Sequence, residues 1–199
     1  HRNPLCGRNF EYFSEDSLVS GKIAAAAVRG VQSAGVSACP KHFACNNQEV
    51  NRIYNDSIVS QRALREIYLK GFEICVKEGN PLNLMTSYNK INGVWGHYHY
   101  DLVQTILRRE WGYQGNVMTD WWMRNAPSPE FPHLRANAYR VRSGVDVLMP
   151  GSSGIATGKR FPDGTLLQTF GKEDGITLGE LQYCAKNVLN CVRKLKELK

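Results

Sequence analysis

Residues 60–88 read SQRALREIYLKGFEICVKEGNPLNLMTSY, a stretch in which a helix pattern passes directly into a strand pattern. The first part, 60–78, repeats apolar side chains at helical spacing, and Gly79 with Pro81 ends that pattern. The second part, 82–88, is a short apolar run of the kind that forms buried strands. The stretch therefore predicts a helix followed at once by a strand. The apolar face of the predicted helix consists of Leu64, Ile67, Tyr68, Phe72, Cys75 and Val76.

The same order of helix, glycine and strand recurs along the chain. Further strands are predicted over 35–41, 115–120 and 145–149. Strands that alternate with helices indicate βα units in a parallel sheet with right-handed crossovers. The predicted fold class is α/β, with an open doubly wound sheet as a structural alternative. Further helices are predicted over 17–34, 100–110, 133–143 and 177–199, the last opening with a capping box of Thr177 and Glu180.

Composition bounds the kind of protein. The 199 residues are 42% hydrophobic and carry 25 Lys and Arg against 18 Asp and Glu, a formal net charge of 25 − 18 = +7. This argues against disorder and suits one domain, or one domain with an appendage. The cations are scattered, which argues against nucleic acid, and no apolar run approaches the ~20 residues of a membrane span. The polar start of the chain predicts no targeting segment, and we expect a soluble protein with no membrane partner.

The six cysteines are predicted to be small core residues, because no two of them have the CxxC spacing. Spacing also argues against a metal site, since His42, His97, His99 and His133 do not supply paired ligands. We expect no metal and no organic cofactor. The cysteines weakly favour a reducing compartment, such as the cytoplasm.

Residues that could carry chemistry gather where the predicted strands end. Lys41 and His42 follow the first strand, Tyr88 ends the second, and Asp120 with Trp121 ends the third. The carboxyl ends of parallel strands meet at one rim, and extended loops at that rim build active sites. A carboxylate held ionised by nearby cations, with a tryptophan beside it, suits a sugar ring and attack at its anomeric carbon.

Each of these features also has a structural interpretation. His42 alone could be a buried structural histidine, and Asp120 alone could cap a helix. The loop 44–59 is rich in short polar side chains that suit sugar hydroxyls, but it could also be an ordinary solvated loop. A second long loop, 151–176, is rich in Gly and Ser and is predicted to be irregular.

Four motifs together resemble one known family. They occur in this order: RNPLCGRNFEYFSED at 2–16, KHF at 41–43 with NNQE at 46–49, MTSYNKING at 85–93, and VMTDW at 117–121. In type and order they are similar to glycoside hydrolase family 3, the β-glucosidase family. The run GVDVLMP at 144–150 resembles the last barrel strand of that family. The run that follows KHF departs from the signature of the hexosaminidase branch, which disfavours that branch.

The resemblance implies a role for each matching residue. Asp120 corresponds to the nucleophile, which forms a covalent glycosyl-enzyme in a retaining, exo-acting mechanism on terminal β-linked glucose or a similar sugar. Arg8, Lys41 and His42 correspond to residues that bind the sugar hydroxyls. The remaining matches are Met85 lining the pocket, Tyr88 beside the nucleophile, and Trp121 as an aromatic platform. From their chemistry, we expect the cations to depress the pKa of Asp120 and Tyr88 to orient its carboxylate.

The resemblance also implies that the chain is incomplete. Residues 1–199 correspond to strands five to eight of a (β/α)8 barrel of the TIM type, with the motifs in 1–150, the loop 151–176 and a C-terminal helix 177–199. The N-terminal half barrel and an α/β sandwich domain that commonly supplies the general acid are then the expected partners, beside a β-glucoside or oligosaccharide substrate. Uncovered strand edges make self-association possible. Two other functions stay open: a non-catalytic carbohydrate-binding or assembly module, and a purely structural fragment.

Overall fold

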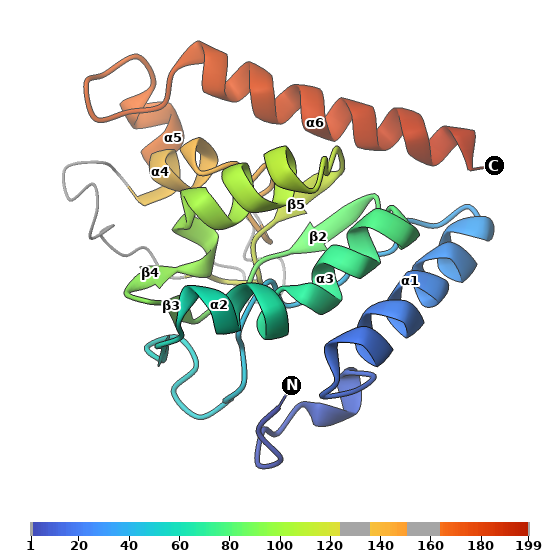
Figure 1. The fold of residues 1–199 in the computed structure, drawn as a ribbon. Coiled ribbons are helices and arrows are strands. Elements are labelled where there is room, and N and C mark those ends of the chain that lie inside the picture. Colours follow the sequence, from blue (N-terminus) through green and yellow to red (C-terminus); the bar gives the residue numbers. More distant parts are fainter. Residues whose placement is uncertain (1, 124–135, 151–163, 199) are drawn as a thin grey trace.

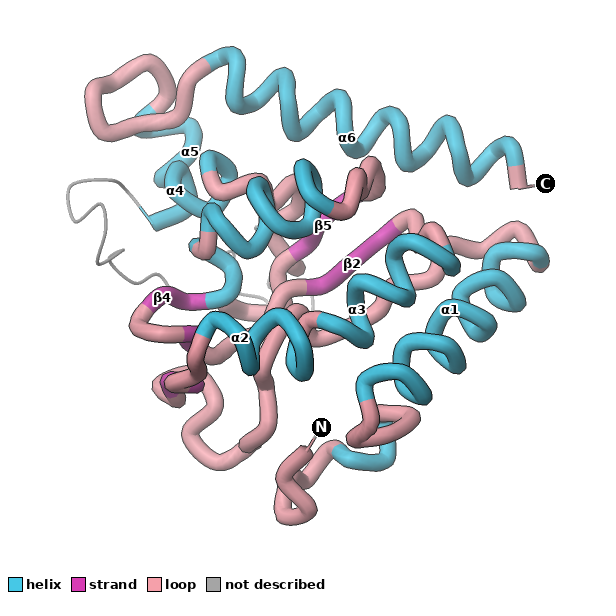
Figure 2. Tube along the Cα trace, in the orientation of Figure 1, coloured by secondary structure: helices cyan, strands magenta, loops and turns pink. Residues whose placement is uncertain are grey.

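The computed structural model describes residues 2–123, 136–150 and 164–198 (Figure 1). Helices lie around a small central sheet, and a second small sheet lies toward one side of the molecule (Figure 2). This arrangement confirms the predicted α/β class. The helical segments are η1 Asn9–Glu11, α1 Ser17–Ser33, α2 Gln61–Ala63, η2 Leu64–Tyr68, α3 Lys70–Ile74, η3 Cys75–Gly79, η4 Gly96–Tyr98, η5 Asp101–Glu110, α4 Ala136–Arg142, α5 Gly164–Thr169 and α6 Leu178–Glu197.

The helix ends follow the capping signals in the sequence. The Asp16 side chain accepts a hydrogen bond from the Val19 amide at 2.8 Å and opens α1. At the start of α6, Thr177 and Glu180 form the predicted capping box with each other's backbone amides. These caps satisfy amides that have no partner inside the helix. The predicted boundaries of both helices are therefore confirmed to within about two residues.

The predicted helix over 60–78 is a continuous helical run from α2 to η3 in which α and π turns alternate. Ser60 caps its start by accepting from the Ala63 amide, and Asn80 ends it in the left-handed region at φ 50°. The predicted helix over 100–110 is also present, as the π-type η5. Of the predicted helix over 133–143, α4 covers residues 136–142, and 133–135 lie outside the described residues.

The central sheet pairs β2 Asn83–Met85 in parallel with β5 Asn116–Met118. The segment 38–43 runs along the free edge of β2, where the amides of Asn83 and Met85 donate to Ala38 and Pro40. On the far side of β5, a parallel bridge joins Met118 to Val147. Four extended segments therefore lie side by side in the order 38–43, β2, β5 and 145–149.

Two of the four predicted strands are not regular strands. The prediction over 35–41 is wrong in this respect because Pro40 has no N–H, which interrupts the ladder to β2. The prediction over 145–149 is wrong because the amides of Asp146 and Val147 both donate to the Val117 carbonyl, at 2.8 and 3.1 Å. Two residues then oppose one, as in a β-bulge. The order and the parallel direction of the four segments agree with the prediction.

A second small sheet was not predicted. It joins β1 Asp56–Ser57, β3 Lys90–Ile91 and β4 Val94–Trp95 in the order β1, β3, β4. Asn92 and Gly93 form the turn between β3 and β4, both at positive φ. Asn-Gly is the strongest short signal for a β-hairpin. The hairpin could therefore have been predicted from Asn92 and Gly93, which the sequence analysis uses only as part of the motif 85–93. The short helix α5 was also missed, within the loop predicted over 151–176, of which 151–163 lie outside the described residues.

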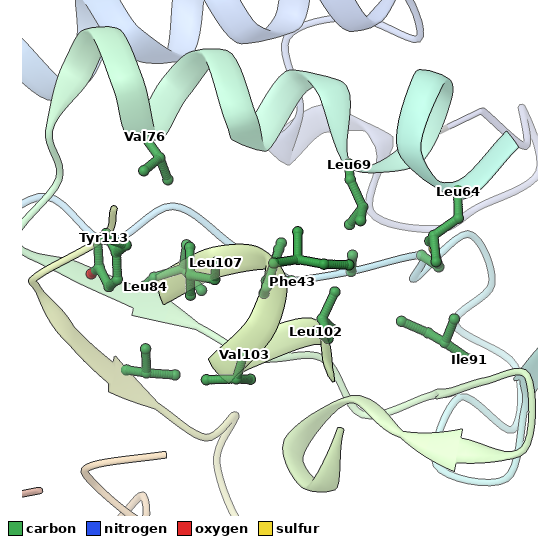
Figure 3. Close-up of a cluster of buried hydrophobic side chains, with 14 of the residues drawn as sticks. Phe43, Leu64, Leu69, Val76, Leu84, Ile91, Leu102, Val103, Leu107 and Tyr113 are labelled. Carbon is green, nitrogen blue, oxygen red and sulfur yellow. The ribbon is translucent and has the colours of Figure 1, made fainter. Parts of the chain in front are cut away.

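The main core fills the space between the helical run 61–79, η5 and the central sheet. In Figure 3, Leu69 and Val76 point from the helical run toward Phe43, Leu84 and Leu107. The ring of Phe43 is fully buried and meets Phe72 edge-on, with ring centroids 5.1 Å apart. This packing fixes the segment that carries Lys41 and His42 against β2. The other fully buried members, at 1% exposure or less, are Ala44, Ile91, Leu102, Val103, Val117 and Val145.

The side of the molecule near α1 is less completely filled. A cavity of about 300 Å³ lies between α1, α3 and the segment 38–42. Leu18, Val19 and Ile23 of α1 are between 44% and 58% exposed. Among the described residues, no backbone segment pairs with the edge of 38–43 that faces away from β2.

Candidate active site

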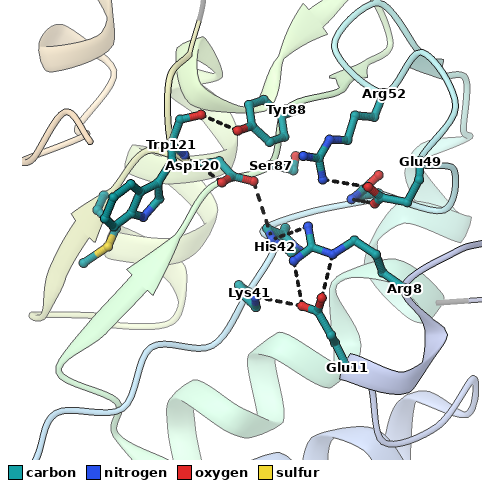
Figure 4. A network of polar contacts seen from close by, with 12 residues as sticks. Arg8, Glu11, Lys41, His42, Glu49, Arg52, Ser87, Tyr88, Asp120 and Trp121 are labelled. Carbon is teal, nitrogen blue, oxygen red and sulfur yellow. Dashed lines mark hydrogen bonds and ion pairs between the residues drawn. The ribbon is translucent and has the colours of Figure 1, made fainter. Parts of the chain in front are cut away.

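The site lies at the carboxyl ends of the parallel segments (Figure 4). Lys41 and His42 end the segment 38–43, Tyr88 follows β2, and Asp120 follows β5. Arg8 reaches the same place from the chain just before η1, where it contacts His42. The predicted convergence of these side chains at one rim therefore occurs in the structure.

The Asp120 carboxylate uses only one of its two oxygens. Its Oδ1 accepts from the backbone amide of Trp121 at 2.7 Å. Its Oδ2 is buried and has no hydrogen-bond partner among the described residues. Nε2 of His42 lies 3.5 Å from Oδ2, which is long for a hydrogen bond. Asp120 thus presents an open oxygen inside the site.

Burial raises the pKa of the Asp120 carboxyl. The Trp121 amide and the charges of Arg52, Arg8 and Lys41 oppose that rise, but they do not outweigh it. The cations thus lower this pKa as expected, but burial, which the sequence analysis did not include, decides the net direction. The physical reason is that Asp120 is buried, with 7% of the residue exposed, while no Lys or Arg among the described residues lies within ion-pair distance of its carboxylate.

Glu11 joins two of the predicted sugar-binding residues. Its carboxylate accepts from Nε and Nη2 of Arg8, both at 2.7 Å, and it lies 2.7 Å from Nζ of Lys41. These contacts, the Arg8 hydrogen bonds first, lower the pKa of Glu11 to about 2, and Glu11 in turn raises the pKa of Arg8. The two cations are thereby held side by side by one carboxylate.

His42 is almost fully buried and lies between three polar groups. Its Nδ1 is 2.6 Å from the Tyr12 hydroxyl, and its Nε2 is 3.3 Å from Nη1 of Arg8. Burial first, then the charges of Arg8 and Lys41, lower the pKa of His42 to about 3, so the ring is neutral near pH 7. A neutral imidazole has one N–H, and Nε2 faces a donor in Arg8 and an acceptor in Asp120. It can serve only one of them at a time.

Tyr88 acts on the backbone beside Asp120. Its hydroxyl donates to the carbonyl oxygen of Trp121, and the Arg52 guanidinium lies over its ring, 4.4 Å from the centroid. Burial and the nearby charge of Asp120 raise the pKa of Tyr88 to about 12, so it remains a phenol. The hydrogen bond to Trp121 fixes the main chain beside Asp120, and the role of Tyr88 in orienting the carboxylate stays a prediction.

The polar loop 44–59 brings a second ion pair to the site. Nη1 of Arg52 lies 2.6 Å from Oε2 of Glu49, while Oε1 of Glu49 accepts from Asn46 at 2.9 Å. Sequence reasoning counted these side chains as candidates for sugar hydroxyls and did not foresee that they pair with one another. It also missed the roles of Glu11 and Tyr12, although both lie in the motif 2–16.

Trp121 and Met85 complete the predicted set. Trp121 is 40% exposed and meets Trp122 edge-on, with ring centroids 5.4 Å apart. An exposed indole beside a carboxylate offers an apolar face on which a sugar ring can stack. Met85 is half-buried at the end of β2, where its carbonyl accepts from the Phe43 amide. No polar contact links Met85 to Asp120 in the described part of the chain.

The described ranges contain no group of three or more His, Cys, Asp or Glu side chains placed to hold a metal ion. Five of the six cysteines are buried and all six are free thiols. None of the described helices has the length and apolar character that crossing a membrane requires.

Known proteins are similar to this chain in both sequence and fold. The model of the "Glycosyl hydrolase family 3 N terminal domain" matches residues 1–163. The chain belongs to glycosyl hydrolase family 3. Its relatives in this family include a β-glucosidase of Ruminococcus albus, 46% identical over 96% of this chain and 19% of the relative. They also include an exo-α-(1→6)-L-arabinopyranosidase of Bifidobacterium longum, 52% identical over 60% of this chain and 16% of the relative.

A solved structure of the same family superposes closely. β-Glucosidase 3B from Thermotoga neapolitana, in complex with α-D-glucose, matches with a TM-score of 0.84 and 42% identity. The match covers 100% of this chain and 27% of that one. The chain thus spans about a fifth to a quarter of the length of these family 3 relatives.

Proposed function

We propose that this chain forms part of a retaining, exo-acting β-glycosidase that hydrolyses terminal β-linked glucose or a similar sugar. The proposal rests chiefly on the open oxygen of Asp120, a buried carboxylate whose Oδ2 has no partner among the described residues. A nucleophile needs such an unoccupied lone pair. Membership of family 3 and the β-glucosidase names of its relatives support the reaction class.

In the proposed reaction, Oδ2 of Asp120 attacks the anomeric carbon as the glycosidic bond breaks, and the leaving oxygen takes a proton from the general acid. Water then attacks the covalent glycosyl-enzyme and gives its proton to the same group, now acting as a base, which releases the sugar with net retention and frees the Asp120 carboxylate. Arg8, Lys41 and His42 would donate hydrogen bonds to the sugar hydroxyls. The exposed face of Trp121 would stack on the ring. Met85 would line the pocket.

The general acid is proposed to come from outside this chain. Retaining enzymes hold the acid about 5 to 5.5 Å from the nucleophile. The two glutamates in the described part of the site, Glu11 and Glu49, are ion-paired, and the low pKa of Glu11 does not suit an acid. No motif assigns that role to another glutamate.

We also propose that residues 1–199 are one partial barrel domain, equivalent to strands five to eight. The four parallel segments in sequence order, the unpaired edge of 38–43 and the 300 Å³ cavity beside α1 support this arrangement. The remaining half barrel and a sandwich domain would be its partners. A second copy is the alternative cover for the same edge.

The names of the relatives leave more than one sugar as a candidate substrate. One relative is named for L-arabinopyranose and several for glucose, so both sugars belong among the tested substrates. A non-catalytic carbohydrate-binding module is the alternative function, since the cations and Trp121 could bind a sugar without turnover.

A fluorinated substrate tests the proposal. A dinitrophenyl β-glucoside with fluorine at the sugar 2-position is incubated with this chain and followed by intact mass, because its leaving group needs no general acid. We expect an increase of one fluoroglucosyl group that is absent in Asp120→Ala. Asp101→Asn, at the exposed start of η5, is the matched control and should label like wild type.

The other outcomes decide between the alternatives. Labelling that persists in Asp120→Ala would contradict Asp120 as the nucleophile. Saturable glucose binding without labelling would favour a carbohydrate-binding module. Neither binding nor labelling would indicate a structural part that needs the rest of the barrel.

A further inference from the structure

Three cations surround Asp120, and none of them pairs with it. The charges of Arg52, Arg8 and Lys41 all act on the Asp120 carboxyl, where they lower its pKa against the effect of burial. Yet the only basic group within ion-pair distance of this carboxylate, among the described residues, is the neutral ring of His42. Long, flexible cationic side chains normally close onto a nearby carboxylate.

Each of these cations is instead engaged by another carboxylate. Glu11 takes both Arg8 and Lys41, with three contacts of 2.7 Å, and Glu49 takes Arg52 at 2.6 Å. Figure 4 shows the two glutamates on the side of the cations that faces away from Asp120. The side chains of both glutamates are only 19% and 20% exposed, so these pairs are more ordered than surface pairs.

The arrangement matters for a nucleophile. A carboxylate held in a bidentate pair with an arginine has its lone pairs occupied. A cation at a longer distance favours the ionised form of the carboxylate without occupying an oxygen. Held at that distance, the cations also keep their remaining N–H groups for a ligand.

We propose that Glu11 and Glu49 are positioning residues that hold the three cations off the carboxylate of Asp120. This inference rests on the proposed function, in which Asp120 attacks the sugar. It adds that the open oxygen of Asp120 exists because two other carboxylates compete successfully for the cations. The charged and titratable groups around Asp120 are Arg8 from the N-terminal segment, Lys41 and His42 from 38–43, Arg52 from the loop before β1, and Tyr88 after β2. Glu11 and Glu49 are paired with the cations of this set.

The first test measures the pKa of Asp120 in this chain without any substrate. The carboxyl is followed by carbon-13 NMR during a pH titration and assigned with Asp120→Asn. In Glu11→Gln, the released cations close onto Asp120 and its pKa falls by about one unit. Arg8→Gln then raises this pKa far more in the Glu11→Gln background than in wild type, a coupling that a double-mutant cycle isolates.

Equal effects of Arg8→Gln in the two backgrounds would overturn the proposal. The reason is that Glu11 would then act on Asp120 only through its own charge. Glu11→Asp, which keeps the charge on a shorter side chain, should restore most of the wild-type pKa. A role confined to stability would lower the unfolding midpoint in Glu11→Gln and leave the coupling at zero.

The second test measures the rate of labelling by the fluorinated glucoside well above the pKa of Asp120. Glu11→Gln and Glu49→Gln should each label about tenfold more slowly, because a cation now occupies the attacking oxygen. In these variants we expect both a lower pKa of Asp120 and a lower plateau rate of labelling than in wild type. A plateau rate equal to or above wild type would overturn the proposal.

Glu78→Gln is the matched control, since Glu78 pairs with Lys22 at 2.7 Å on the exposed surface, away from the site. Its labelling rate should equal that of wild type. The two proposals also fail in different ways. A wild-type chain that does not label contradicts only a working nucleophile within this chain on its own, while the NMR coupling still decides the role of Glu11.

Discussion

Asp120 and Asp146 are both buried aspartates with an arginine nearby, but their oxygens are used in opposite ways. Oδ2 of Asp146 accepts from Arg108 at 2.6 Å and from the Val117 amide at 2.7 Å, and Oδ1 accepts from Asn187 at 2.8 Å. Oδ2 of Asp120 has no partner in the described ranges. Burial raises the pKa of both carboxyls, so burial does not distinguish them. What distinguishes them is whether the lone pairs are occupied.

The two aspartates also serve opposite ends of the central sheet. Arg108 extends the Asp146 network to the carbonyls of Gly115 and Gly144, at 3.1 and 3.3 Å, and so ties η5 to the chain entering the sheet. Asn187 adds α6 to the same network. In βα folds of this kind, the amino ends of the strands serve stability and the carboxyl ends serve chemistry. Asp146, whose two oxygens both accept hydrogen bonds, lies at the amino ends of the strands, and Asp120, with its open oxygen, lies at the carboxyl ends.

Replacing Asp146, whose two oxygens both accept hydrogen bonds, should have the largest effect on the free energy of unfolding. Asp146→Ala leaves the Arg108 guanidinium buried without its partner, which costs about 3–5 kcal/mol of unfolding free energy. Urea unfolding followed by circular dichroism measures this difference. A loss below about 1 kcal/mol would remove the distinction between the two aspartates.

His42, which faces Oδ2 of Asp120, should give the next largest effect, on the pH dependence of the unfolding free energy. Its pKa is about 3 in the folded chain and 6.5 in the unfolded chain, so protons bind the unfolded state first as the pH falls. Stability is therefore complete above pH 6.5 and declines below it, by about 2 kcal/mol between pH 6.5 and 5. His42→Gln should lack this part of the decline. The unfolding free energies of His42→Gln are subtracted from those of wild type at each pH, which removes the contribution of the buried His97. A difference that does not change with pH would contradict the prediction.

Replacing the open aspartate should stabilise the chain while abolishing labelling. Asp120→Asn removes a buried, incompletely paired charge, and we expect a gain of about 1 kcal/mol at pH 7. Because the folded pKa is raised, wild-type stability falls as the pH rises through the range above 3.8, and the advantage of the variant grows over the same range. Parallel urea titrations at pH 4 and 7 would reveal this, and a variant less stable than wild type at pH 7 would show that Oδ2 has a partner after all.

The smallest effect is expected at an exposed ion pair. Glu110 and Arg65 form two contacts of 2.6 and 2.9 Å between side chains that are about 40% exposed or more. Solvent screens such pairs, so Glu110→Gln should cost less than about 1 kcal/mol. High salt should reduce the cost further. A larger loss in urea unfolding would mean that pairing alone, without burial, accounts for the effect of Asp146→Ala.

Much of the fold could be predicted because it depends on local patterns. Apolar spacing predicted all the long helices, and the glycines that end them predicted the order of the four parallel segments. The exceptions are also local: Pro40 interrupts one predicted strand, and Asn92 with Gly93 forms a hairpin whose signal was present but not used. Knowledge of the motifs identified the convergent site residues, and the structure brings them together.

The pairing inside the site could not be predicted. Glu11, Glu49 and Asp120 are all carboxylates near cations, and the sequence does not say which carboxylate takes which cation. That choice depends on distances of a few ångströms set by the packing of η1, the segment 38–43 and the loop before β1. The net direction of the Asp120 pKa shift could not be predicted for the same reason, since it depends on burial and on contacts that only the fold defines.

Trp121 links the Asp120 carboxylate and the exposed indole of the proposed site through one piece of backbone. Its amide holds Oδ1 of Asp120, and its carbonyl accepts the Tyr88 hydroxyl, while its indole remains exposed. The indole and the carboxylate are therefore anchored to one short, doubly fixed piece of main chain. A ligand that tilts the indole would also re-aim the carboxylate. In the proposed reaction, changes at this position that alter the affinity for the sugar should then also alter the rate of its reaction, so affinity and turnover could not be adjusted independently.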